Sequence, residues 1–254
     1  DLEGKNSKYL PFEEGETGIV YCKNAFLDFR VEKRNGSELH FISGENLYDQ
    51  PFETFVRVGN RYEEKVIRVS FSPTRKYQID SVSYDWSQFS SFDYMLEPVE
   101  QVEVNTLDAS SPATVYFYPY KNSARIVEFY MQYGGWGGDE NDLRKLLGDA
   151  ASQVEIPDIV SGTPGLYGTK VSFCHHEQRL DAGLDKELKV SKTVEAGKHV
   201  RLEVYNGIEQ YHVPYKAYLS NSLTGKKLEI SGTLSSKRPF NYLIIPIAIT
   251  DEDK

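Results

Sequence analysis

The sequence has little positive charge, and this shortage narrows the range of partners. Its 254 residues contain 29 Lys and Arg against 38 Asp and Glu, which gives a formal net charge of −9 and a pI near 5.2. An acidic surface repels phosphate groups, so we expect no nucleic-acid partner. Anionic lipid would also repel such a surface, so docking on a membrane would need a receptor, a glycan or exposed aromatic side chains.

Long apolar runs are also missing. The longest one, residues 242–249, is interrupted by Pro246, whereas a membrane-spanning helix needs about 18 or more consecutive apolar residues. The chain begins with Asp1 rather than Met. A secreted protein whose signal peptide has been removed would begin with a residue other than Met, and so would a chain cut at an arbitrary boundary. We expect a soluble, secreted, extracellular protein.

Cysteine is scarce, and its two positions leave two alternatives open. Cys22 and Cys174 could close one long-range disulfide in an oxidising compartment, or remain two buried thiols in a reducing one. Spacing does not decide between them, because a disulfide requires a specific geometry. The sequon at Asn35, in the polar turn RNGSE, makes that residue a candidate glycosylation site and mildly supports secretion.

The sequence contains no recognisable set of catalytic or metal-binding residues. Its densest cluster is Cys174-His175-His176-Glu177. Neighbours on a strand point to opposite faces, so at most Cys174 and His176 could share a site, whereas zinc takes three or four protein ligands. A GxSxG nucleophile motif, a phosphate-binding glycine motif and the EF-hand spacing are all absent. We therefore expect no enzyme activity, no cofactor and no metal.

What the sequence does have is alternation of apolar and polar residues, together with 18 Tyr and 13 Phe. Period-two alternation is typical of half-buried strands, and aromatic residues favour strands. The clearest alternating runs are residues 65–71, 200–205 and 227–230. Turn-forming pairs stand between such runs: Gly59-Asn60, Ser72-Pro73, Ser111-Pro112, Asn206-Gly207 and Thr224-Gly225. The pattern predicts an all-β fold with antiparallel pairing.

One segment, residues 139–154, has helical spacing instead. Its apolar residues are Leu143, Leu146, Leu147, Ala150 and Val154. Asp139 is a plausible N-cap, so we expect one short amphipathic helix. A composition change near residue 100 predicts a compact N-terminal lobe over 1–100 and a module of longer strands over 101–254.

Residues 190–222 show a distinctive order of elements: a strand, a turn at Ala196-Gly197, a long alternating strand, a break, and a further strand. This order resembles the C-terminal part of the aerolysin and epsilon-toxin/Mtx2 superfamily, although Ala196 stands where proline is frequent. The matching positions are Gly197, Val200, Leu202, Val204, Tyr205, Val213, Pro214, Tyr215 and Ala217. Residues 102–130 are similar to the family's first long strand, with Asn105 and Ser110-Ser111-Pro112 at its polar start.

The resemblance is to short eukaryotic members of the hydralysin-like or spherulin-2A-like kind. It implies an elongated, aerolysin-type antiparallel β-module and a secreted protein. The toxic members bind a receptor, assemble into a homo-oligomer and refold an internal hairpin into a transmembrane β-barrel, which satisfies every backbone group in lipid. The insertion segment would then lie at about 131–180.

Within that segment, the residues expected to contact membrane or ligand are apolar or aromatic. They are Tyr133, Trp136, Leu143, Leu147, Ile156, Ile159, Leu166, Tyr167 and Phe173. The segment departs from the family pattern, because a helix and several Pro and Gly residues interrupt it and only residues 168–173 form a clean strand pattern. Two functions follow as hypotheses. One is a β-pore-forming toxin or immune effector that acts on membrane lipid, a receptor or a glycan. The alternative is a non-lytic storage or yolk protein, or a carrier of an apolar lipid or pigment.

Overall fold

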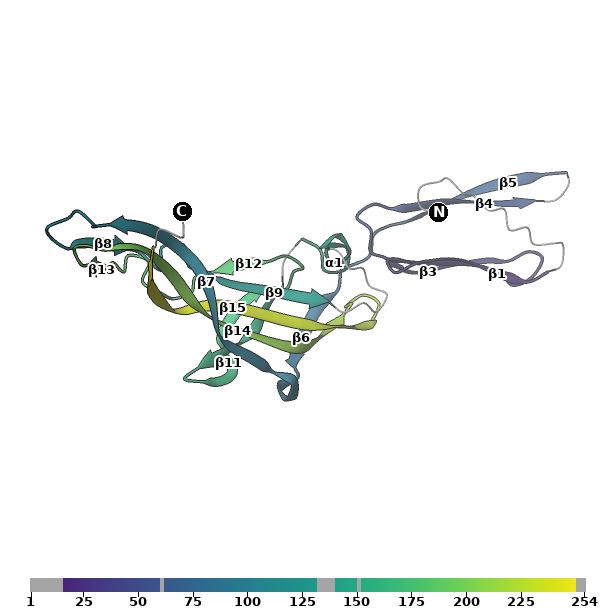
Figure 1. Cartoon of the computed structure of the whole chain (residues 1–254). Helices are drawn as coiled ribbons and strands as arrows, with labels where there is room; N and C mark the ends of the chain where they lie inside the picture. The colour runs from purple at the N-terminus through teal and green to yellow at the C-terminus, as the bar shows by residue number, and fades with distance from the viewer. Residues whose placement is uncertain (1–15, 60–61, 132–139, 150–151, 250–254) are drawn as a thin grey trace. The chain divides into compact units, whose positions relative to one another are not determined.

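The structure, a computed structural model, describes residues 16–59, 62–131, 140–149 and 152–249 (Figure 1). Strands dominate these residues, so the all-β prediction is confirmed. The chain divides into two compact units, and each combines three segments that are distant in the sequence. The first unit contains 1–82, 132–174 and 216–230, and the second contains 83–131, 175–215 and 231–254. The predicted boundary near residue 100 remains a prediction.

The first unit contains two small antiparallel sheets formed by neighbouring strands. One has the order β1-β2-β3, and the other is the hairpin β4-β5. Their bounds are β1 Gly18–Lys23, β2 Leu27–Lys33, β3 Leu39–Asn46, β4 Phe52–Gly59 and β5 Glu64–Phe71. Phe29 of β2 is buried, and its ring centroid lies 5.7 Å from that of Phe52 and 6.5 Å from that of Phe71. These aromatic contacts join the two sheets, whose ribbons are visible in Figure 1.

A buried carboxylate holds three parts of the first unit together. Glu45, at the end of β3, is only 6% exposed. It accepts hydrogen bonds from the hydroxyls of Tyr77 at 2.7 Å and Thr224 at 3.0 Å. Nζ of Lys226 donates to its other oxygen at 3.0 Å. Burial and the bond to Glu45 raise the pKa of Tyr77. This network fixes the turn after residue 220 against β3.

We expect Glu45→Gln to lower the free energy of unfolding by about 2 kcal/mol, because hydrogen bonds to a charged group contribute about 1.5–3 kcal/mol. The amide keeps the shape of the side chain but loses the charge that Lys226 faces. Urea denaturation would measure the change. Glu38→Gln, in an exposed turn, is the matched control and should change stability by less than about 0.5 kcal/mol. Equal losses in both variants would show that the network contributes nothing specific.

The predicted helix exists, but it is shorter than expected. Helix α1 spans Glu140–Leu147 and buries Leu143 and Leu146. Nζ of Lys145 lies 4.8 Å from the ring centroid of Phe26. The helix ends at Gly148, whose φ of +80° is the left-handed conformation that closes helices.

The predicted extension of the helix to residue 154 is therefore wrong, since Val154 belongs to strand β10. The predicted N-cap, Asp139, and Ala150 lie outside the described residues.

The second unit is built mainly on one antiparallel sheet. Its strand order is β12-β9-β15-β14-β6, and β7 also pairs with β14 (Figure 1). A separate two-stranded ladder joins β8 to β13. The bounds are β6 Gln78–Tyr84, β7 Ser90–Asn105, β8 Ala113–Phe117, β9 Arg125–Met131, β12 Gln178–Leu180, β13 Val190–Val194, β14 His199–Ser220 and β15 Lys227–Ala248. A 3₁₀ turn, Trp86–Gln88, precedes β7. Strands β14 and β15 have 22 residues each and contribute to both units, as does β6, most of which belongs to the first unit.

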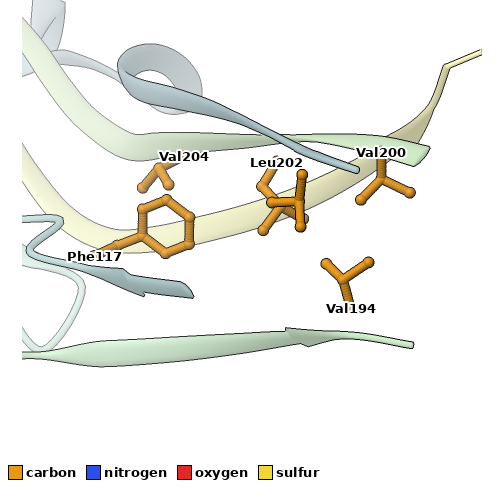
Figure 2. Packing of buried hydrophobic residues seen from close by; sticks show 6 residues of the cluster. Phe117, Val194, Val200, Leu202 and Val204 are labelled. Carbon is orange, nitrogen blue, oxygen red and sulfur yellow. The ribbon is translucent and has the colours of Figure 1, made fainter. Parts of the chain in front are cut away.

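A hydrophobic core lies between the β8-β13 ladder and the large sheet (Figure 2). Phe117 of β8 is 1% exposed and packs with Val194 of β13. The apolar residues of β14 that alternate from Val200 to Val204 form the other side of this core (Figure 2). The alternation that predicted a strand over 200–205 thus places one face of β14 in a core, as expected.

Two details of the predicted strands are wrong. Asn206-Gly207 forms no turn, because β14 continues through it and pairs with Glu97 and Leu96 of β7. Glycine is needed at position 207 because the side chain of Asn241 lies close to the backbone there. A Cβ at this position would lie 1.9 Å from Oδ1 of Asn241. Residues 102–130 do not form one long strand either. They contain the end of β7, then β8 and β9.

Candidate functional site

The predicted insertion segment contains a β-hairpin. Strands β10, Gln153–Val160, and β11, Thr163–Ser172, pair in an antiparallel ladder. Ser161 and Gly162 connect them, with φ of 51° and 77°. Positive φ at both central residues defines the type I′ turn, whose twist matches that of a two-stranded ladder. Val160 and Thr163 are the last pair before this turn.

Proline and glycine do not prevent this hairpin from forming. The pairing register shifts between Glu155 and Pro157. Proline has no backbone N–H, and such an irregularity in the ladder tolerates its absence. Pro164 is the second residue of β11 and pairs with Ile159 near the turn. Because β10 and β11 form a sheet of only two strands, each strand has one edge whose backbone N–H groups face no further strand. A proline on that edge removes no hydrogen bond of the ladder. The prediction that 168–173 is the only strand in this segment is therefore wrong.

The base of the hairpin is buried and fixed. Val154 and Val171 face each other across the ladder and are both buried. Ile156, which is fully buried, and Phe173, which is 2% exposed, add to this apolar surface. The backbone N–H of Phe173 donates to the carbonyl of Ser152 at 2.9 Å, which closes the base.

The turn end of the hairpin, in contrast, exposes apolar side chains. Val160 is 46% exposed, Leu166 is 47% exposed and Tyr167 is 49% exposed. Leu166 lies opposite Pro157 in the ladder. The phenol of Tyr167 donates to the carbonyl of Thr163 at 3.2 Å, which ties it to the strand on which it lies. We call Val160, Leu166 and Tyr167 the hairpin tip.

Polar residues separate the tip from the base. Glu155 and Lys170 are directly opposite each other, an arrangement in which opposite charges attract. The backbone N–H of Gly168 donates to Oε1 of Glu155 at 2.6 Å. Gly168 has a φ of 88°, which the irregular register of β11 requires and which only glycine adopts without strain. Glu155 and Lys170 thus lie toward the base of the hairpin, whereas Asp158, opposite Gly165, lies close to the tip.

The predicted contact residues fall into four groups. Leu143 and Leu147 belong to α1, where the first is buried and the second half-buried. Ile156 and Phe173 are buried at the hairpin base, and Ile159 is half-buried on β10. Leu166 and Tyr167 form part of the exposed tip, while Tyr133 and Trp136 lie outside the described residues. The candidate role of these residues remains a prediction.

Val160 was not among those candidates. The sequence feature that could have identified Val160 as a tip residue is its position directly before Ser161-Gly162, the pair that forms the turn.

The two cysteines are separate thiols in the structure. Cys22 is half-buried on β1, where it pairs with Phe29, and Cys174 is buried just after β11. Burial raises the pKa of the Cys22 thiol. Cys22 lies in the β1-β2-β3 sheet and Cys174 follows the β10-β11 sheet, and no disulfide joins them in the structure. Which of the two alternatives holds for the protein in its own compartment remains a prediction. The expectation that Cys174 to Glu177 form a strand is wrong, since they lie in the bend between β11 and β12.

Asn35 lies in the exposed turn between β2 and β3, as an acceptor of glycosylation should. Its Oδ1 accepts a hydrogen bond from the N–H of Ser37 at 2.9 Å. Glycosylation itself remains a prediction. Among the residues that the structure describes, no three His, Cys, Asp or Glu side chains are grouped so as to hold a metal ion. In the same part of the chain, no helix is long and apolar enough to cross a membrane.

Comparison with solved structures gives distant similarities. No family model and no curated protein matches the sequence. A lamprey immune protein has a similar solved structure, with 13% identity over 88% of this chain and 72% of that one, and a TM-score of 0.40. Parasporin-2, a Bacillus thuringiensis toxin that recognises cancer cells, gives 11% identity over 67% and 73% and a TM-score of 0.32. The Mpp75Aa1.1 β-pore-forming protein of Brevibacillus laterosporus gives 7% over 91% and 89% and a TM-score of 0.30.

All three of these similarities are distant. At identities of 13% or lower and TM-scores of 0.40 or lower, they describe a distant likeness in fold and assign no function.

Proposed function

We propose that this chain is a secreted β-pore-forming protein, a toxin or immune effector, whose β10-β11 hairpin enters the membrane after the protein has oligomerised. One observation carries the proposal. The segment between the two stretches that resemble the aerolysin superfamily contains a β-hairpin with an exposed apolar turn end. The proposed activity is assembly and insertion, and it requires no catalytic residue.

The dimensions of the hairpin suit this role. Strands β10 and β11 have 8 and 10 residues, and a membrane-crossing β-strand needs about 9–11. An insertion hairpin meets the hydrocarbon first with its turn, so apolar side chains there lower the cost of entry. Backbone groups that enter lipid must all be paired, which a ring of hairpins closed into a barrel achieves. Assembly from several copies is therefore part of the proposal.

Dye release from liposomes tests the proposal directly. Vesicles of several lipid compositions, with and without glycolipid, should release a trapped dye when the protein is added, and SDS-resistant oligomers should form. A polarity-sensitive fluorophore on Val160→Cys, in a chain with Cys22 and Cys174 replaced by Ala, should shift to shorter wavelength as leakage proceeds. Absence of both leakage and oligomers on every composition would overturn the proposal. It would favour the alternative, a non-lytic storage or carrier protein, which native mass spectrometry of naturally sourced protein would examine for a bound ligand.

A further inference from the structure

Two places in the chain have an asparagine followed directly by a glycine. Asn35-Gly36 lies in the exposed turn between β2 and β3, and Asn206-Gly207 lies within β14. In such a pair the backbone nitrogen of the glycine can attack the side-chain amide of the asparagine and close a small ring, because no Cβ crowds the approach. The surroundings of the two pairs decide which of them reacts.

The side-chain amide of Asn35 is held in an arrangement that favours this attack. Its Oδ1 accepts hydrogen bonds from the backbone N–H of Ser37 at 2.9 Å and from the hydroxyl of Ser37 at 3.0 Å. Its Nδ2 donates to Oε2 of Glu38 at 3.0 Å. When a nucleophile adds to Cγ, negative charge develops on Oδ1, and donors already placed at that oxygen stabilise it. Ser37 therefore activates the amide toward the backbone nitrogen that precedes it.

The attacking group, the backbone nitrogen of Gly36, lies in open surroundings. Apart from the neighbouring residues in the chain, no heavy atom is within 4 Å of the place that a Cβ of Gly36 would occupy. The backbone N–H of Arg34 donates to the carbonyl of Glu38 at 3.2 Å, so the turn is closed outside the peptide unit that joins Asn35 to Gly36. That peptide unit can rotate toward the side chain, and water reaches it from the solvent.

The second pair is held in the opposite way. Asn206 is 8% exposed, and Asn206 and Gly207 pair with Glu97 and Leu96 of β7. Ring closure requires the peptide unit after the asparagine to rotate, which would break the ladder on which β14 depends. The side chain of Asn241 also lies against Gly207 and restricts that movement. The same two residues are thus reactive in one place and protected in the other.

We propose that Asn35 is a site of spontaneous deamidation when it carries no glycan. The backbone nitrogen of Gly36 gives up its proton to solvent and bonds to Cγ of Asn35. The bond from Cγ to Nδ2 breaks, and Nδ2 takes up protons from solvent and leaves as ammonia. Water then opens the cyclic imide at either carbonyl. Opening at Cγ gives aspartate at position 35, and opening at the main-chain carbonyl gives isoaspartate.

This modification changes the turn in two respects. It removes Nδ2, the atom to which a glycan would be attached, so the converted turn is no longer a glycosylation acceptor. It also adds one negative charge beside Glu38, in a chain whose formal net charge is already −9. Neither the β10-β11 hairpin nor a membrane takes part, so the reaction occurs whether or not the protein forms pores.

Peptide mapping by mass spectrometry tests the proposal on the full chain, produced in bacteria so that it carries no glycan. After several weeks at mildly alkaline pH, most of the peptide that contains Asn35 should have gained the mass that exchange of an amide for an acid brings. It should contain both aspartate and isoaspartate. The peptide that contains Asn206 should be unchanged in the folded protein, and it should convert as fast as the Asn35 peptide once urea has unfolded the chain.

Two variants separate the roles of the turn residues, and circular dichroism would verify that each is folded. Gly36→Ala should slow the conversion by at least about tenfold, because small displacements of an attacking atom have large effects on rate. Ser37→Ala should slow it by about twofold to tenfold, the effect of one ordinary hydrogen bond, and Ser37→Thr, which keeps the hydroxyl, should not. Unchanged rates in both alanine variants would overturn the proposal. So would an unmodified Asn35, equal conversion of Asn35 and Asn206 in the folded protein, or aspartate without isoaspartate.

Discussion

Replacing Phe117 with alanine is expected to lower the free energy of unfolding by about 3–5 kcal/mol, the usual cost of removing a buried phenylalanine. Phe117 is 1% exposed and is a central side chain of the core between the β8-β13 ladder and β14 (Figure 2). It contributes the only aromatic ring among the buried residues of that cluster, whose other members are Val104, Val194, Val200, Leu202 and Val204. These branched side chains cannot fill the space that a lost ring leaves, so a cavity would remain.

The neighbouring residue supplies a matched control. Tyr116 lies on the same strand, 56% exposed, with Nζ of Lys189 4.1 Å from its ring centroid. Tyr116→Ala removes a ring of similar size from the opposite face and should cost about 1 kcal/mol or less. Urea denaturation followed by circular dichroism would compare the two variants. If Tyr116→Ala cost as much as Phe117→Ala, the cluster would not be the core that the burial of its side chains indicates.

The parts of the fold that could be predicted from the sequence are those that period-two alternation controls. Residues 200–205 and 227–230 alternate because one face of each strand is buried, and both runs lie within strands. Turn chemistry was a weaker guide. Asn206-Gly207 has the composition of a hairpin turn, yet the glycine is needed where Asn241 approaches the backbone of β14. Close approach of a side chain to a backbone and a tight turn both favour glycine, and a single sequence does not distinguish them.

The hairpin was the part of the candidate site that sequence patterns described least well. Pro157 and Pro164 argue against a strand inside a large sheet, but β10 and β11 form a sheet of two edge strands, where proline is tolerated. The predicted end of the helix was wrong for a related reason. Val154 continues the helical spacing of α1, but Gly148 in the left-handed conformation ends the helix first. Single residues with special backbone geometry thus decide boundaries that periodicity leaves open.

The second large effect concerns the hairpin tip. Replacing both Val160 and Leu166 with aspartate is expected to reduce dye release from liposomes by at least about 100-fold. Each of these side chains is nearly half exposed in the soluble protein, so the double variant should fold with little loss of stability. Arginine or lysine on a lipid-facing position of a barrel costs about 2–4 kcal/mol at the bilayer midplane, and aspartate costs less. The proposed oligomer repeats the cost of both aspartates in every copy. The barrier to insertion therefore rises while the soluble fold is kept.

A second hairpin of the same chain provides the control. Val66 of β5 is 56% exposed, so Val66→Asp places one of the two added charges on a similarly accessible valine outside β10-β11. This variant should release dye at the rate of the unmodified protein. If Val66→Asp abolished release while the tip variant retained it, the β4-β5 hairpin would be the membrane-entering element. Loss of release in both variants, with SDS-resistant oligomers still formed, would indicate that both hairpins contact the bilayer and that β10-β11 alone does not determine insertion.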